Sequence, residues 1–331
     1  MANLHAKRPL NLPITNYLVV IVGPTAVGKT AIAISLAEML TAEIVSADSR
    51  YLYRGMDIGT AKPSPGERAR APHHLIDVTT PDHPWTLNEF QTAALAAIAD
   101  IQARGRLPLL VGGTGQYIRA IVEGWQVPPG NPGGELRTGL EAALARDGVG
   151  ALAARLAEVD PASAARVDLR NPRRVIRALE VALTTGESFV AQRRKSPQPC
   201  AVTIIGLTLP RPELYARIDR RVEAMLKAGL VDEVRSLAAQ GYGWDLPAMS
   251  ALGYKQIGEY LRGECDLPEA ARRIRSETRQ FVRRQANWFK PADPAIKWFD
   301  VGRTRPEEIA AYLQGTLRTQ MKTTKVVTTN S

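Results

Sequence analysis

The stretch that decides the fold is YLVVIVGPTAVGKT, residues 17–30. It opens with a short, continuous apolar run rich in β-branched side chains, which is typical of a strand buried on both faces of a parallel sheet. The rest matches the pattern G-x-x-x-x-G-K-[ST] and precedes an expected helix over 31–40. The sequence therefore predicts a phosphate-binding loop made of Gly23, Pro24, Thr25, Ala26, Val27, Gly28, Lys29 and Thr30.

Each part of this loop suits a phosphate group. The glycines let backbone N–H groups turn toward phosphate oxygens, and the N-terminus of the following helix favours an anion. Lys29 adds a positive charge, and the Thr30 hydroxyl can bind a Mg²⁺ ion between the phosphates. The motif specifies only a di- or triphosphate, so ATP and a prenyl pyrophosphate both satisfy it.

Strands and helices are expected to alternate along the chain. Further strands are predicted at 43–47, 75–78, 107–111, 201–209 and 296–301, and further helices at 86–104, 214–239 and 267–289. This alternation predicts an α/β fold with a doubly wound parallel sheet of the P-loop NTPase type.

A change of composition divides the chain. Residues 127–134 (VPPGNPGG) are dense in Pro and Gly and are typical of a hinge, and the sequence from 135 to about 183 has a helical pattern. We therefore expect a helical insertion at 125–199 within a core formed by 17–124 and 200–315. The ends, 1–16 and the polar 316–331, are predicted to be a flexible extension and a disordered tail.

Composition narrows the class of protein. The net charge of +10 and the pI of about 9.8 favour a polyanionic partner such as nucleic acid. The two cysteines, Cys200 and Cys265, lie far apart and form no zinc motif. No apolar run is long enough to span a bilayer, and no signal peptide is evident. We expect a cytoplasmic monomer without membrane contact.

Polar residues follow two of the predicted strands. Asp48 comes directly after the strand at 43–47, and ligands of open parallel sheets gather at the carboxyl ends of strands. Asp48 is therefore a candidate general base or Mg²⁺ ligand, although an N-cap role is an open alternative. Thr114 lies among glycines after the strand at 107–111, where a ligand could approach closely or a plain turn could form.

Basic residues gather in two places. Within the helix predicted at 267–289, four arginines fall within about 80° of one another and predict a ridge that contacts a phosphate backbone: Arg272, Arg275, Arg279 and Arg283. A second basic group lies in the insertion, where Asn171-Pro172 indicates a helix start. It comprises Arg166, Arg170, Arg173, Arg174, Arg177, Arg193, Arg194 and Lys195.

Eight segments between 17 and 301 together resemble the tRNA dimethylallyltransferase (tRNA isopentenyltransferase) family, bacterial type. They are GPTAVGKT (23–30), ADSRYLYRGMDIGTAKP (47–63), HHLIDV (73–78), LLVGGTGQY (109–117), NPRRVIRALEV (171–181), LYARIDRRVEAML (214–226), ALGYKQ (251–256) and TRQFVRRQANWFK (278–290). Agreement over so many segments is far more specific than the phosphate-binding motif alone.

The resemblance implies a mechanism. The phosphate-binding loop would hold dimethylallyl pyrophosphate and Mg²⁺, with Thr30 as the metal ligand. The acceptor would be N6 of adenosine 37, in the anticodon stem-loop of tRNAs that read codons beginning with U, and it would be flipped into a channel. Asp48 would accept the proton of the amine, and Thr114 and Arg221 would steady the departing pyrophosphate.

The resemblance also implies a set of tRNA contacts drawn from both parts of the chain. They are Asp48, Ser49, Arg50, Tyr51, Thr114, Arg137, Arg173, Arg174, Val175, Ile176, Arg177, Ser250, Gly253, Tyr254, Lys255, Arg283, Arg284, Gln285, Trp288 and Lys290.

Three other functions remain open at the level of sequence. An isopentenyltransferase acting on free adenine nucleotide would use the same donor, but it would need no arginine ridge. A P-loop kinase of a small metabolite would use ATP, yet no arginine-rich lid follows the core. A non-enzymatic RNA-binding protein would not need an intact Lys29, Thr30 and Asp48.

Overall fold

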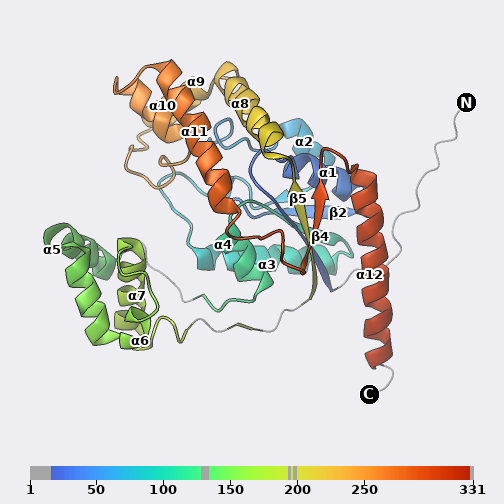
Figure 1. Cartoon of the computed structure of the whole chain (residues 1–331), viewed down its shortest axis with the longest axis horizontal. Helices are drawn as coiled ribbons and strands as arrows, with labels where there is room; N and C mark the ends of the chain where they lie inside the picture. The colour runs from blue at the N-terminus through green and yellow to red at the C-terminus, as the bar shows by residue number, and fades with distance from the viewer. Residues whose placement is uncertain (1–15, 128–133, 193–194, 197–199, 329–331) are drawn as a thin grey trace, which may run out of the picture. The chain divides into compact units, whose positions relative to one another are not determined.

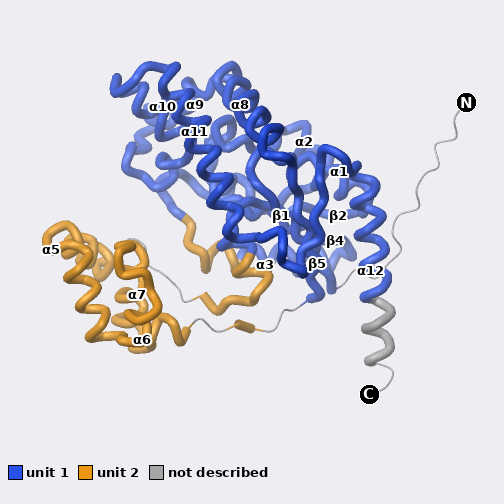
Figure 2. The backbone as a smooth tube through the Cα atoms, in the orientation of Figure 1, with its two compact units in different colours: residues 1–84, 93–118, 199–331 blue, residues 85–92, 119–198 orange. Residues whose placement is uncertain are grey.

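The computed structural model of the protein describes residues 16–127, 134–192, 195–196 and 200–328. The chain forms two compact units, coloured separately in Figure 2. Unit 1 consists of 1–84, 93–118 and 199–331, and unit 2 of 85–92 and 119–198. Each unit is described by itself. The predicted extension at 1–16 and the hinge at 127–134 fall almost entirely outside the described residues.

A parallel six-stranded sheet forms the centre of unit 1, as the sequence predicts. Its order is β3-β2-β4-β1-β5-β6. Figure 1 labels β2, β4 and β5 of this sheet. β1 pairs with β4 and β5 on either side, and every residue of it is buried; Tyr17, Val19 and Ile21 belong to the hydrophobic core. The strands are β1 (Tyr17–Val22), β2 (Ala42–Ser46), β3 (His73–His74), β4 (Leu107–Val111), β5 (Ala201–Thr208) and β6 (Ile296–Asp300).

The register of the sheet brings three strand ends to one edge. Val111, the last residue of β4, pairs with Ile21 of β1 and with Ser46 of β2. The loops that follow β1, β2 and β4 therefore leave the sheet side by side, at its carboxyl edge.

Helices connect the strands. α1 packs against α12, while α8 to α11 pack on one another in sequence and α8 also contacts α11. α3 and α4 each contain residues of both units. The helices outside the insertion are α1 (Lys29–Leu40), α2 (Pro65–Arg70), α3 (Leu87–Ala103), α4 (Gly115–Val122), α8 (Arg211–Lys227), α9 (Leu230–Ala239), α10 (Tyr254–Leu261), α11 (Leu267–Gln285) and α12 (Pro306–Thr328).

The strand predicted at 75–78 is wrong. β3 ends at His74, and Leu75 and Asp77 have positive φ values of 61° and 57°, which an extended strand does not allow. The carboxylate of Asp77 instead pairs with Lys62 and Arg68 at 2.6 and 2.7 Å. The segment is apolar enough for a strand, but these ion pairs fold it into a turn.

The single helix predicted at 214–239 is two helices. Gly229 adopts a left-handed conformation (φ 98°) between α8 and α9, so the chain changes direction there.

The tail predicted from residue 316 to be disordered is helical at its beginning. α12 continues to Thr328, and Leu317 is only 2% exposed within the core of unit 1. Leu313 and Leu317 lie one helical turn apart and pack into the core. The polar composition of the rest of the segment led to the prediction of disorder.

Unit 2 has a small core of its own. Its helices are α5 (Glu135–Val159), α6 (Pro161–Ala164) and α7 (Pro172–Thr185). The side chain of Asn171 accepts from the backbone N–H of Arg174 at 3.3 Å, which confirms the predicted helix start. The buried core consists of Leu140, Leu152, Leu156, Val175, Ile176, Ala178 and Leu179.

Among the described residues, every helix is too short or too polar to cross a membrane.

Truncating Leu317 tests the placement of α12. We expect Leu317→Ala to lower the free energy of unfolding by about 2–4 kcal/mol, because it removes buried methyl groups and leaves a cavity. The neighbouring exposed Arg318→Ala should change it by less than about 0.5 kcal/mol. Urea denaturation of both variants measures the difference, and equal stabilities would show that the segment does not pack.

Candidate active site

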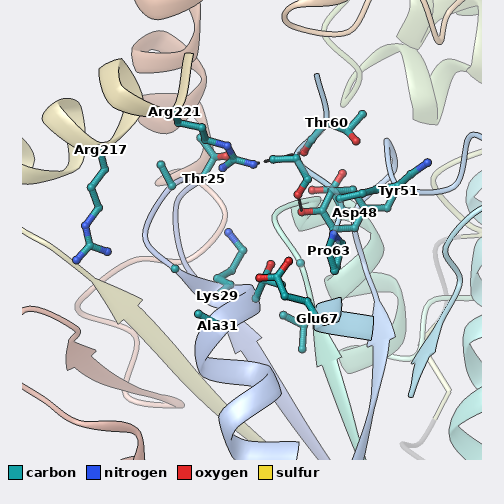
Figure 3. A pocket seen from close by; sticks show the side chains of 17 residues that line it. Thr25, Lys29, Ala31, Asp48, Tyr51, Thr60, Pro63, Glu67, Arg217 and Arg221 are labelled. Carbon is teal, nitrogen blue, oxygen red and sulfur yellow. Dashed lines mark hydrogen bonds between the residues drawn. The ribbon is translucent and has the colours of Figure 1, made fainter. Parts of the chain in front are cut away.

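A cavity of about 450 Å³ opens at the carboxyl edge of the sheet in unit 1. The phosphate-binding loop, the turn after β2, the loop at 60–63 and α8 all contribute to it (Figure 3). Its lining consists of Thr25, Ala26, Gly28, Lys29, Thr30, Ala31, Asp48, Tyr51, Thr60, Ala61, Lys62, Pro63, Glu67, Val111, Gly112, Arg217 and Arg221.

The phosphate-binding loop has the backbone that its sequence predicts. Gly28 has a φ of 104° and is the N-cap of α1, a conformation that a side chain would strain. The Lys29 ammonium donates to the carbonyl oxygens of Gly23 and Pro24, each at 2.9 Å. The loop thus curves around the lysine, and the first turn of α1 faces the cavity with its unpaired N–H groups.

Three cations surround this loop. Arg217 and Arg221 lie one turn apart on α8, and they donate to Val27 O at 3.0 Å and to Thr60 O at 3.4 Å. Burial lowers the pKa of Lys29 from 10.5 to about 8; the Asp48 carboxylate opposes this shift and the Arg221 charge adds to it. Such a concentration of positive charge favours a multiply charged anion.

Asp48 faces the cavity from the turn after β2. Its Oδ1 accepts from the backbone N–H of Arg50 at 3.0 Å, which fixes the carboxylate at the start of the turn. Thr114 holds the same turn, because its hydroxyl accepts from Ser49 N at 3.1 Å and its own N–H donates to Ala47 O at 3.2 Å.

Thr114 is not among the residues that line the cavity. Its contacts connect it to the backbone beside Asp48, so they support a role in orienting the carboxylate. The closeness of the two strand ends explains this placement: a Cβ on Gly112 would lie 2.1 Å from the carbonyl oxygen of Ala47.

Tyr51 lies deep in the cavity beside Asp48. Its hydroxyl donates to Ala61 O at 2.8 Å. Burial first, and then the Asp48 charge, raise the pKa of Tyr51 to about 12, so the phenol stays protonated and acts as a hydrogen-bond donor.

Gln285, predicted as a tRNA contact, joins two loops of the site. Its side-chain carbonyl accepts from Thr25 N at 2.9 Å, and its amide donates to Gly113 O at 3.1 Å. Trp288 packs so closely on Gly115 that a Cβ there would lie 2.1 Å from the indole. The C-terminal end of α11 therefore supports the phosphate-binding loop.

The predicted arginine ridge is largely neutralised. Arg275 pairs with Glu223 at 3.4 Å and Arg279 with Asp219 at 2.6 Å, and both carboxylates come from α8. Arg272 pairs with Glu269 on its own helix at 2.6 Å. Helical geometry alone does not show that Arg275 and Arg279 pair with carboxylates of another helix, so the sequence did not predict these ion pairs. The phosphate contact of the ridge stays a prediction.

The other predicted tRNA contacts differ in how far their side chains are exposed. Val175, Ile176 and Tyr254 are buried at 3% exposure or less, so their side chains face the interior. The exposed group is Ser250, Lys255, Arg173, Arg174, Arg283, Arg284 and Lys290. Arg137 and Arg177 lie between these extremes and both approach Glu180, at 3.6 and 2.8 Å, while Gly253 caps α10.

Arg217 was not among the predicted site residues, although the sequence contains a signal for it. Arg217 and Arg221 are four residues apart in a helical segment, a spacing that places both on one face.

A phosphate-binding loop, converging cations and the Asp48 carboxylate at the carboxyl edge of a parallel sheet define a P-loop-like α/β enzyme. The chain belongs to the IPP transferase family, whose sequence profile matches residues 51–292. A second profile, described as isopentenyl transferase, matches residues 16–74. The family resemblance predicted from the motifs is confirmed.

Named relatives agree with this membership. The chain is 56% identical over 273 residues to a tRNA dimethylallyltransferase of Roseiflexus sp. (strain RS-1), which covers 82% of this chain and 90% of that one. It is 49% identical over 304 residues to a tRNA dimethylallyltransferase of Thermomicrobium roseum, and the match covers 91% of this chain and 92% of that one.

Solved structures share the fold. A full-length tRNA isopentenylpyrophosphate transferase from Bacillus halodurans is 39% identical, with a TM-score of 0.70 and coverage of 94% of this chain and 99% of that one. A eukaryotic dimethylallyltransferase acting on tRNA is 25% identical, with a TM-score of 0.73 and coverage of 86% and 74%.

The lowered pKa of Lys29 predicts how anion affinity depends on pH. Only the charged ammonium attracts a pyrophosphate, so affinity should be level below about pH 8. Above that value it should fall by up to about tenfold per pH unit, until the higher pKa of the complex is reached. Calorimetric titration with a pyrophosphate monoester, whose phosphates are ionised above about pH 7, measures this profile.

Lys29→Arg is the matched control, because a guanidinium keeps its charge over this range. Its profile should be flat; a flat profile for the unaltered protein would mean that Lys29 does not titrate in the free site.

Proposed function

We propose that the protein transfers a dimethylallyl group from dimethylallyl pyrophosphate to N6 of adenosine 37 in tRNAs that read codons beginning with U. One observation carries this proposal: Asp48 faces the cations of the phosphate-binding loop across a single cavity. Family membership supports the prenyl donor, and the printed names of the relatives, tRNA dimethylallyltransferases, support tRNA as acceptor.

The cations of the site bind the prenyl donor. Lys29, Arg221 and Arg217 meet the pyrophosphate, together with the N–H groups at the start of α1. As the bond between the allylic carbon and the pyrophosphate oxygen breaks, negative charge grows on the leaving group, and fixed positive groups stabilise it. The Tyr51 hydroxyl donates its one proton to Ala61 O, so it holds the loop at 60–63 and not the leaving group.

Asp48 acts on the acceptor amine. The N6 nitrogen forms a bond to the allylic carbon, pyrophosphate leaves with the bonding electron pair, and the Asp48 carboxylate accepts the proton that N6 loses. Thr114 keeps the turn of Asp48 in place through Ser49 N and Ala47 O. The rate then depends chiefly on holding the amine and the allylic carbon together.

Magnesium fits this site. Mg²⁺ prefers oxygen ligands, keeps several waters and takes the rest of its ligands from substrate phosphates, so one hydroxyl and one carboxylate suffice. Thr30 would hold the ion, and Asp48 is a carboxylate in the same lining. When bound, the ion supplies positive charge against the pyrophosphate.

We propose the exposed cations as contacts for tRNA phosphates. Arg283, Arg284 and Lys290 lie at and beyond the C-terminal end of α11, and each is exposed. Arg173 and Arg174 are exposed in the first turn of α7, in unit 2. Their charges would position the anticodon stem-loop without reading its sequence.

Labelled dimethylallyl pyrophosphate with Mg²⁺ tests the acceptor directly, with unmodified tRNA and free AMP offered in parallel. We expect label on tRNA alone, at the adenosine that follows the anticodon. Label on AMP would instead indicate the free-nucleotide enzyme, and absence of label on both would contradict the proposal.

Asp48→Asn tests the proposed base. The amide keeps an oxygen that can accept from Arg50 N, so the turn survives, but it lacks the basicity of a carboxylate. Single-turnover transfer should fall by about 10²- to 10⁴-fold, while tRNA affinity changes by less than about twofold. The exposed Asp82→Asn should leave both unchanged, and a loss of tRNA affinity in Asp48→Asn would identify Asp48 as a structural residue.

A further inference from the structure

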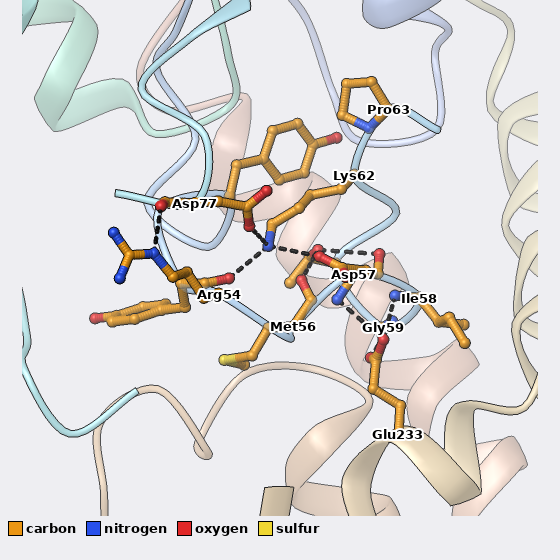
Figure 4. Close-up of polar contacts among 12 residues, drawn as sticks. Arg54, Met56, Asp57, Ile58, Gly59, Lys62, Pro63, Asp77 and Glu233 are labelled. Carbon is orange, nitrogen blue, oxygen red and sulfur yellow. Dashed lines mark hydrogen bonds and ion pairs between the residues drawn. The ribbon is translucent and has the colours of Figure 1, made fainter. Parts of the chain in front are cut away.

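The carboxylate of Glu233 holds three consecutive backbone N–H groups of a loop beside the cavity (Figure 4). Asp57 N and Ile58 N donate to Oε2 at 3.0 and 2.7 Å, and Gly59 N donates to Oε1 at 3.1 Å. The Tyr254 hydroxyl adds a fourth hydrogen bond, to Oε1 at 2.5 Å. Hydrogen bonds to a charged acceptor are strong, so this one side chain fixes the loop backbone.

A buried lysine fixes the same loop from its other side. Lys62 has a side chain only 1% exposed, and its ammonium pairs with Asp57 at 2.7 Å and with Asp77 at 2.6 Å. It also donates to the carbonyl oxygen of Tyr53. A buried ammonium needs such partners, so the loop ends cannot separate without exposing an unpaired charge.

Thr60 and Ala61, which lie in the loop between the contacts of Glu233 and Lys62, line the cavity. Thr60 O accepts from Arg221 at 3.4 Å and Ala61 O accepts from the Tyr51 hydroxyl at 2.8 Å. The loop has no freedom to move toward α10, because a Cβ on Gly59 would already lie 2.4 Å from the Tyr254 ring.

The geometry points to Glu233 and Lys62 as positioning residues for the donor pyrophosphate. Neither acts on substrate as an acid or base. They fix the 57–62 loop, in which Thr60 O orients the Arg221 guanidinium toward the leaving group and Ala61 O accepts from the Tyr51 hydroxyl. This inference rests on the proposed function for the identity of the donor, and it assigns Glu233 a role although Glu233 is not among the residues that line the cavity.

Glu233→Gln tests it through binding of an unreactive dimethylallyl thiolodiphosphate with Mg²⁺. A glutamine turns an N–H₂ group toward Gly59 N or toward the other two N–H groups, so the loop loses at least one bond and shifts. We expect about tenfold weaker analogue binding, a matching rise of KM for the donor, and little change in tRNA affinity.

Asp232→Asn is the matched control. It removes the same charge from the first turn of α9, but its side chain is 77% exposed and pairs with Arg235 on the surface. It should bind the analogue as the unaltered protein does. Equal binding by Glu233→Gln would overturn the inference and leave the proposed function intact, whereas failure of the unaltered protein to bind the analogue would contradict the proposed function itself.

A double-mutant cycle separates positioning from general stability. If Glu233 acts through Arg221, then Glu233→Gln should weaken binding by less than about twofold in an Arg221→Ala background. A full tenfold loss in that background would show that Glu233 acts only by stabilising the fold.

Should Glu233→Gln fail to fold, Tyr254→Phe replaces it in the same cycle, because that change removes only the hydroxyl hydrogen bond to Oε1. Analogue binding that is about twofold to threefold weaker in Tyr254→Phe would support the inference, provided that the same change has no effect in the Arg221→Ala background. Unchanged binding would contradict it.

Discussion

The parallel register of β1, β2 and β4 is the constraint on which the site depends. It aligns the last residues of the three strands, so the phosphate-binding loop, the turn of Asp48 and the turn of Thr114 leave the sheet together. The strand ends are so close that Gly112 has no room for a side chain beside Ala47 O. One hydrophobic sheet therefore places the donor-binding and acceptor-binding groups at a fixed separation.

Around this edge the protein separates positive from negative charge. Cations from α1 and α8 gather on the pyrophosphate side, where burial lowers the pKa of Lys29. On the other side the Asp48 carboxylate accepts from Arg50 N, and the Thr114 hydroxyl holds the same turn through Ser49 N. Carboxylates away from the cavity hold other basic groups. Asp219 and Glu223 pair with arginines of α11, and Glu233 holds the loop that orients Arg221.

The sequence predicts the parts of the site that depend on local pattern. The run at 17–22, the loop at 23–30 and the position of Asp48 after a strand are all local, and they appear as predicted. The sequence does not predict which charged faces pack together. The sequence did not predict that Arg275 and Arg279 pair with carboxylates of α8, or that Gln285 contacts the phosphate-binding loop. In each case the partner lies more than fifty residues away along the chain.

In the proposed reaction the phosphate-binding loop holds pyrophosphate as a leaving group, and no phosphoryl group is transferred. A donor labelled with ¹⁴C in the prenyl group and ³²P in the pyrophosphate, incubated with Mg²⁺ and unmodified tRNA, tests this most directly. We expect ¹⁴C on the tRNA, an equimolar amount of released ³²P-labelled pyrophosphate, and no ³²P on the tRNA. Recovery of ³²P on the acceptor, or of ¹⁴C only in the unreacted donor, would contradict it.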